Sequence, residues 1–237
     1  MDPITVAVER GGVVESRHRV HAVRVEGGEA VEAWGDPELV TFMRSSAKPL
    51  QALPLVRVYE ILSDEEVAIA CASHGAAPEQ LEAVKLLLAR SWSSEDDLEC
   101  GPVEGSRLRH NCSGKHAGLL LACRLLGLPA KGYEQASHPL QRAIRRRLSD
   151  LASYPEEKIG SAVDGCGLVV FRLPLSAIAL AYARLLARLP RVVEDVRMEI
   201  AIARVEDVPH AQAMRGHDLV HAAEDVRQSR AWDDTIH

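Results

Sequence analysis

The chain has 237 residues, with 28 Lys and Arg against 34 Asp and Glu, and a formal net charge of −6. Its apolar fraction of 47% and charged fraction of 26% are ordinary for a soluble globular protein, and they exclude a disordered chain, a collagen and a small disulfide scaffold. The acidic balance and the aromatic content of 4% argue against a nucleic-acid partner, which requires basic surface and stacking side chains.

The N-terminal region has no apolar segment followed by a small-residue cleavage site, so no secretory leader is expected. The most apolar stretch, residues 173–189, is interrupted by Arg184 and Arg188 and predicts a buried helix, not a membrane span. Cysteines are odd in number, widely spaced and without a Cys-x-x-Cys pair, which predicts a reduced, cytoplasmic protein. They are Cys71, Cys100, Cys112, Cys123 and Cys166.

Residues 4–34 alternate valine with polar side chains, and glycine pairs at 11–12 and 27–28 mark two reversals. This pattern predicts antiparallel hairpins, and residues 39–44 predict a further short extended piece. The helices that follow are predicted over residues 50–62, 63–72, 78–90, 112–126, 140–152 and 176–189, with a strand over 167–175. A capping box from Ser63 to Glu66 should begin the second of these helices, and Asn111 should cap the fourth. The sum is an α+β protein.

Residues 44–49, Arg-Ser-Ser-Ala-Lys-Pro, contain a Ser-x-x-Lys pattern. A serine hydroxyl is a weak nucleophile until a base takes its proton. A lysine three residues further along a helical turn, here Lys48 after Ser45, lies on the same side of the turn. The pattern alone fits a helix cap beside a surface lysine at least as well as a catalytic pair.

Residues 111–118, Asn-Cys-Ser-Gly-Lys-His-Ala-Gly, open a predicted helix. The partial positive charge of a helix N-terminus should lower the pKa of the Cys112 thiol, and Lys115 shares a helix face with it. A nucleophile, a metal ligand and a small buried cysteine are all open interpretations. Two further segments place a reactive side chain in a predicted tight turn. They are Cys71–Gly75, which contains Ser73, and Asp164–Gly167, where glycines flank Cys166.

Together these segments resemble one family, the thermolabile or Rhizobium-type L-asparaginases, also called asparaginase II. The matching stretches, in order, are RSSAKPLQALPL (44–55), CASHGAAPEQ (71–80), NCSGKHAGLL (111–120), HPLQ (138–141) and DGCGLVVFRLPL (164–175). NCSGKHAG and DGCG are the most specific of them.

The resemblance implies a fold similar to that of serine β-lactamases and penicillin-binding proteins, an antiparallel sheet flanked by helices. It implies hydrolysis of the side-chain amide of L-asparagine to L-aspartate and ammonia by two Ser-Lys pairs. Ser45 and Lys48 match the first pair, and Ser73 matches the serine of the second. Whether Ser45 or Ser73 attacks the amide stays open.

The same resemblance implies a substrate pocket, a metal ion and a homodimer. Arg44 and Asp164 match residues that line the pocket, where Arg44 would bind the substrate carboxylate and Asp164 its ammonium. Zinc is the expected ion, held by the residues that match Cys112, Lys115 and Cys166, and no organic cofactor is expected.

The chain departs from the family in its last quarter. The family's second serine pairs with a lysine near the C-terminus, whereas no lysine follows Lys158 here. Residues 1–189 are therefore predicted to form an incomplete asparaginase II-like domain, and residues 190–237 a divergent tail. Two hypotheses follow: an active asparaginase, or an impaired member that folds and binds zinc or asparagine without turnover. A β-lactamase or peptidase is disfavoured, because the Ser-Asp-Asn and Lys-Thr-Gly strings of those enzymes do not occur.

Overall fold

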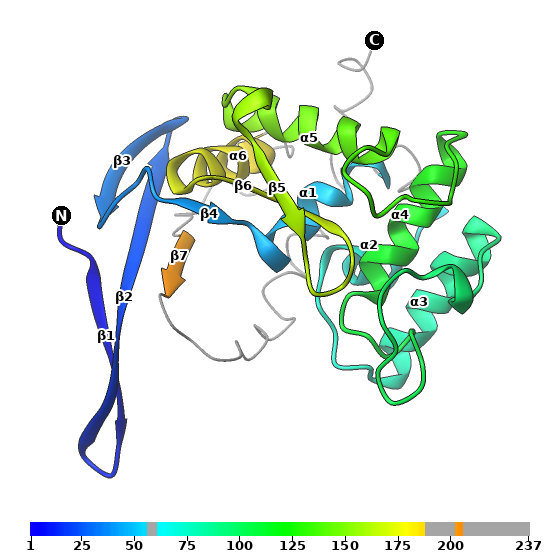
Figure 1. The fold of residues 1–237 in the computed structure, drawn as a ribbon, viewed down its shortest axis with the longest axis horizontal. Helices are drawn as coiled ribbons and strands as arrows, with labels where there is room; N and C mark the ends of the chain where they lie inside the picture. Colours follow the sequence, from blue (N-terminus) through cyan, green and yellow to red (C-terminus); the bar gives the residue numbers. More distant parts are fainter. Residues whose placement is uncertain (56–60, 188–201, 206–237) are drawn as a thin grey trace.

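The computed structural model describes residues 1–55, 61–187 and 202–205. Within them the chain forms two antiparallel sheets and a group of helices, so the predicted α+β class is confirmed (Figure 1). Among the helices of this described part, none combines the length with the apolar character that a membrane crossing requires. The predicted divergent tail, residues 190–237, lies mostly outside the described residues.

The first sheet is built by β1 (Ile4–Arg10), β2 (Val13–Glu26) and β3 (Glu29–Trp34), paired in that order. Both predicted hairpin reversals are confirmed, because the glycine pairs at 11–12 and 27–28 have positive φ, which suits tight reversals. The short strand β7 (Ile202–Val205) pairs with Val20–Val23 of β2. The β1–β2 hairpin extends away from the helices (Figure 1).

The second sheet has the order β4 (Val40–Phe42), β6 (Val169–Pro174), β5 (Gly160–Val163). The extended piece at 39–44 and the strand at 167–175 are thus confirmed, while β5 was not predicted. β5 lacks a buried face, since none of its residues is buried, and this is why its sequence carries no alternating pattern.

Five helices of eight residues or more lie near their predicted positions: α2 (Asp64–Cys71), α3 (Pro78–Ser91), α4 (Ser113–Leu125), α5 (Pro139–Ala152) and α6 (Leu175–Ala187). The prediction of one helix over 50–62 is confirmed only in part. Helix α1 covers Lys48–Gln51 and a 3₁₀ turn follows at 53–55, because Pro54 lacks an N–H and its ring clashes with the preceding helical turn. Residues 56–60 lie outside the described residues.

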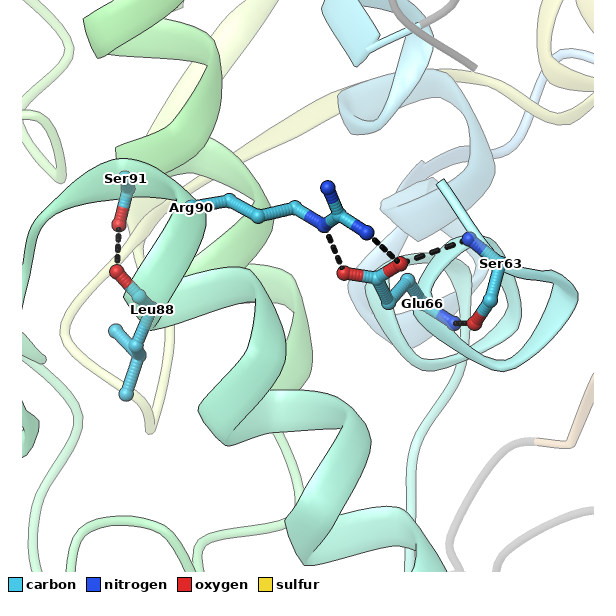
Figure 2. Close-up of polar contacts among 5 residues, drawn as sticks. All are labelled: Ser63, Glu66, Leu88, Arg90 and Ser91. Carbon is cyan, nitrogen blue, oxygen red and sulfur yellow. Dashed lines mark hydrogen bonds and ion pairs between the residues drawn. The ribbon is translucent and has the colours of Figure 1, made fainter. Parts of the chain in front are cut away.

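The predicted capping box is confirmed in full. Glu66 Oε2 accepts from the Ser63 N–H at 2.7 Å, and the Glu66 N–H donates to Ser63 Oγ at 3.3 Å (Figure 2). The same carboxylate, on a fully buried residue, accepts from Arg90 Nε of α3 at 2.5 Å and from Nη2 at 3.2 Å. A local sequence signal therefore also ties α2 to α3.

Helix α4 lies at the centre of the main core, and its residues from Ser113 to Cys123 are all buried. Glycine permits this packing. A Cβ at Gly114 would collide with the Ile69 carbonyl oxygen of α2, and one at Gly118 would lie 3.0 Å from the Ala70 Cβ. The start of α4 is thereby brought against the end of α2, just before Ser73.

Candidate functional site

Lys48 begins α1 and is almost wholly buried, with 1% of its surface exposed. Its ammonium nitrogen Nζ donates to Ser73 Oγ at 2.7 Å, to Ala72 O at 3.0 Å and to Asn111 O at 3.3 Å. Three segments that are distant in the sequence therefore meet at one amine: the 44–49 turn, the end of α2 and the residues before α4.

Burial is the largest influence on Lys48 and lowers its pKa; Cys112 opposes this effect, and the nearby charge of Lys115 adds to it. A lysine whose charged form is disfavoured gives up its proton more readily and can then accept one from a hydroxyl. Ser73, half-buried at hydrogen-bond distance, is the hydroxyl placed to donate.

Ser45 lies on a 3₁₀ turn covering Arg44–Ala47 and is exposed. Its backbone oxygen accepts from the Lys48 N–H, but its hydroxyl is not a hydrogen-bond partner of Lys48 Nζ in this structure. The three-residue spacing thus places Ser45 beside Lys48 along the chain, while the tertiary fold directs the amine toward Ser73.

Cys112, Lys115 and Cys166 also come together, as predicted. Lys115 Nζ lies 3.1 Å from Cys166 Sγ. Hydrogen bonding from the Cys112 thiol is the largest cause lowering the pKa of Cys166, with His116 and Lys115 adding to it. The helix N-terminus was expected to lower the pKa of Cys112, but donation to Cys166 and then burial raise it.

The donor chemistry of this cluster fits zinc, which prefers thiolate sulfur and neutral nitrogen ligands. Within the residues that the structure describes, no three His, Cys, Asp or Glu side chains form a metal site. A zinc site here therefore depends on lysine as the third donor, and the amine would have to be neutral to bind the ion.

Arg44 and Asp164 form an ion pair, with Arg44 Nη2 3.2 Å from Asp164 Oδ1. The aspartate side chain is mostly buried and the arginine side chain is mostly exposed. Arg44 has a φ of 51°, in the left-handed region that a non-glycine residue rarely adopts without local compensation. The two residues predicted to line the pocket thus contact each other across the 44–49 and 164–167 turns.

The structure adds contacts that the sequence motifs did not predict. His74 is buried against Ser113, and His116 Nδ1 lies 2.7 Å from the Tyr133 hydroxyl. The Asn111 carbonyl, not its side chain, contacts Lys48, and Cys112 instead of Asn111 is the N-cap residue of α4, without a side-chain capping bond. The Ser-His pair at 73–74 was the only one of these signals visible in the sequence.

Comparison with protein families gives a match to the family described as L-asparaginase II over residues 6–226. The match includes every residue of the site described above and extends past Leu189 into the predicted tail. Comparison with curated proteins gives no match. Because the family match spans most of the sequence and contains the Lys48 and Cys166 clusters together, the chain belongs to the L-asparaginase II family.

Proposed function

We propose that this protein is an L-asparaginase that hydrolyses L-asparagine to L-aspartate and ammonia through Lys48 and a serine. The observation that carries the proposal is the 2.7 Å contact between Lys48 Nζ and Ser73 Oγ, made by a buried amine of lowered pKa. Family membership supplies the reaction class, and this contact supplies a base and a hydroxyl for it.

Among the hydrogen-bond partners of Lys48 Nζ, Ser73 is the one that can exchange a proton with the amine. Two of its hydrogens are held by the carbonyls of Ala72 and Asn111, which can only accept. The third position faces Ser73, whose hydroxyl accepts from an ammonium and donates to a neutral amine. Lys48 can therefore take a proton through Ser73 and return it to the departing ammonia.

The nucleophile is the hydroxyl that forms an ester with the substrate acyl group as the C–N bond breaks, and water then cleaves that ester. Contact with Lys48 favours Ser73, whereas exposure at the start of the 3₁₀ turn favours Ser45. Arg44 and Asp164 would bind the carboxylate and ammonium of the amino acid, exchanging their mutual ion pair for two with the substrate.

We further propose a zinc ion held by Cys112, Lys115 and Cys166. When bound, the ion would tie the start of α4 to the 164–167 turn and so shape the pocket wall without activating water. Hydrogen bonding from Cys112 and the contact with Lys115 favour a thiolate at Cys166, which a zinc site requires.

Three broader predictions belong to the same proposal. The fold would be that of the serine β-lactamases, with the Ser-x-x-Lys turn entering a helix beside an antiparallel sheet. The protein would be a homodimer, which sedimentation of the purified chain would test, and cytoplasmic, which fractionation of cells that express it would test. Superposition of this fold on those of the serine β-lactamases would test the first of these predictions.

The decisive experiment measures ammonia release from L-asparagine by the purified chain and by the variants Ser45→Ala, Ser73→Ala and Lys48→Ala. Ser46→Ala is the matched control, because this neighbouring hydroxyl donates to Met43 O and is not bonded to Lys48. Mass spectrometry of protein quenched during turnover identifies the acylated serine. Loss of release in Lys48→Ala, with Ser46→Ala unaffected, supports the proposal.

The second candidate is a member that folds and binds asparagine or zinc without turnover. The observation that favours it is that no lysine follows Lys158, so Ser73 has only Lys48 as an amine partner in the described residues. A folded wild-type chain that binds asparagine but releases no ammonia would favour this candidate over an active asparaginase.

A further inference from the structure

His74 directly follows Ser73, is 7% exposed and has no part in the chemistry above. Its Nε2 lies 2.8 Å from Ser113 Oγ, and that hydroxyl donates to Leu108 O at 2.8 Å. Because the single Ser113 hydroxyl proton goes to Leu108, the Ser113 oxygen accepts from His74, which places the ring proton on Nε2. The other ring nitrogen, Nδ1, accepts from the Ala76 N–H at 3.2 Å. A neutral imidazole is therefore satisfied on both sides.

The two segments that His74 joins are those whose carbonyls hold Lys48. The His74 N–H donates to Asn111 O at 3.3 Å, the same oxygen that accepts from Lys48 Nζ. The ring bond to Ser113 fastens residues 72–74 to the start of α4 a second time. A displacement of either segment would move one of the two carbonyls that bind the lysine.

The turn after His74 depends on side chains for its shape. Ala76 has a φ of 61°, in the left-handed region, and its N–H is bound by the His74 ring. Gln80 Oε1 accepts from the N–H groups of Gly75 and Ala77 on either side. Strained backbone of this kind persists only where surrounding contacts hold it, and His74 contributes one of them.

We propose that His74 is a positioning residue: its neutral ring bridges Ala76 and Ser113 and holds the Ser73 turn against α4, so that Lys48 faces Ser73. The inference rests on the proposed function, because it explains how the proton-accepting amine is aimed. Misplacement of a catalytic pair by about 1 Å costs on the order of 10²-fold in rate. Burial, followed by the charge of Lys48, lowers the pKa of His74 to about 4 and keeps the ring neutral at physiological pH.

Two conservative variants separate the two ring nitrogens. In His74→Gln the longer amide can still donate to Ser113, whereas in His74→Asn the shorter side chain can accept near Ala76 but does not reach Ser113. We expect His74→Asn and Ser113→Ala each to lower kcat for ammonia release by on the order of 10²-fold with little change in KM. The double variant should be no worse than either single one, and His74→Gln should restore part of the rate.

Ser91→Ala is the structural control, since it also removes a buried serine-to-carbonyl bond of 2.8 Å, here to Leu88 O (Figure 2). It should leave kcat unchanged. Equal falls in kcat for Ser91→Ala and His74→Asn, or falls that match the lost fraction of folded protein, would overturn the positioning role.

Amide hydrogen exchange of the full chain tests the positioning role of His74 without a measurement of turnover. Residues 72–77 and 111–116 should exchange faster in His74→Asn and Ser113→Ala than in the wild type and Ser91→Ala. If both variants exchange faster but the wild-type protein releases no ammonia, the positioning role of His74 is supported and the proposed function is contradicted. Unchanged exchange and kcat in His74→Asn would show that the inference is wrong.

Discussion

Lys115 Nζ lies 3.1 Å from Cys166 Sγ, a contact that joins the first turn of α4 to the glycine-flanked turn between β5 and β6. Cys112, at the N-cap of α4, belongs to the same cluster, because it is the largest cause lowering the pKa of Cys166. Residues 112 and 166 are far apart in the chain, so a bound ion here would bridge two parts of the fold.

Zinc content should depend on this cluster. We expect the purified protein to contain zinc and Cys166→Ser to contain far less, because an alcohol is a much poorer zinc ligand than a thiolate. Lys115→Met should also lower the affinity, measured by competition with a chromophoric chelator. Cys123→Ala is the control, since Cys123 is buried in the same helix and burial raises its pKa to about 11. Equal zinc content in Cys166→Ser and Cys123→Ala would rule out the site.

The lowered pKa of Lys48 predicts how stability changes with pH. Between its folded pKa and the unfolded value near ~10.4, the unfolded chain binds more protons than the folded chain. The contribution of Lys48 to the free energy of unfolding should therefore increase as pH rises through this window. Lys48→Met should remove that increase, and Lys85→Met, at an exposed position, should not. Urea denaturation at pH 7 and just below the unfolded value of ~10.4 measures the difference; identical pH dependence in both variants would contradict it.

The Glu66–Arg90 ion pair should be a large contributor to stability because the carboxylate is buried (Figure 2). Arg90→Met leaves Glu66 with only the Ser63 N–H, and breaking a buried pair typically costs about 3–5 kcal/mol. We expect a value near the lower end, because the Arg90 side chain is 38% exposed. Arg10→Met, which breaks the exposed pair with Glu15, should leave the urea midpoint nearly unchanged.

Gly114 should tolerate no side chain. In Gly114→Ala the new Cβ would meet the Ile69 carbonyl, and overpacking of this kind typically costs about 1–3 kcal/mol. Because α2 and α4 lead to Ser73 and Cys112, ammonia release should fall as well. Gly101→Ala, where nothing lies within 4 Å of the added carbon, is the control for both thermal unfolding and activity. Wild-type stability in Gly114→Ala would show that the two helices can separate at no cost.

Local signals predicted most of the elements that position the site. The Ser63–Glu66 capping box and the glycine pairs of the hairpins each act within a few residues, so both signals can be read from the sequence alone. The α-helix predicted from residue 50 ends at Gln51, because Pro54 interrupts the helical hydrogen bonds despite the apolar pattern. Strand β5 was missed, because its residues have no buried face to produce a pattern.

The motifs indicated the family by the type and order of their side chains, and the resemblance to that family implied the residues of both clusters. Which partner each one meets was decided only by tertiary structure. Lys48 bonds to Ser73 instead of Ser45, and the lowered thiol pKa is at Cys166 instead of Cys112. Both outcomes depend on burial and on contacts between segments distant in the chain. These contacts form only when α4 packs against α2 and the 44–49 turn meets the 164–167 turn.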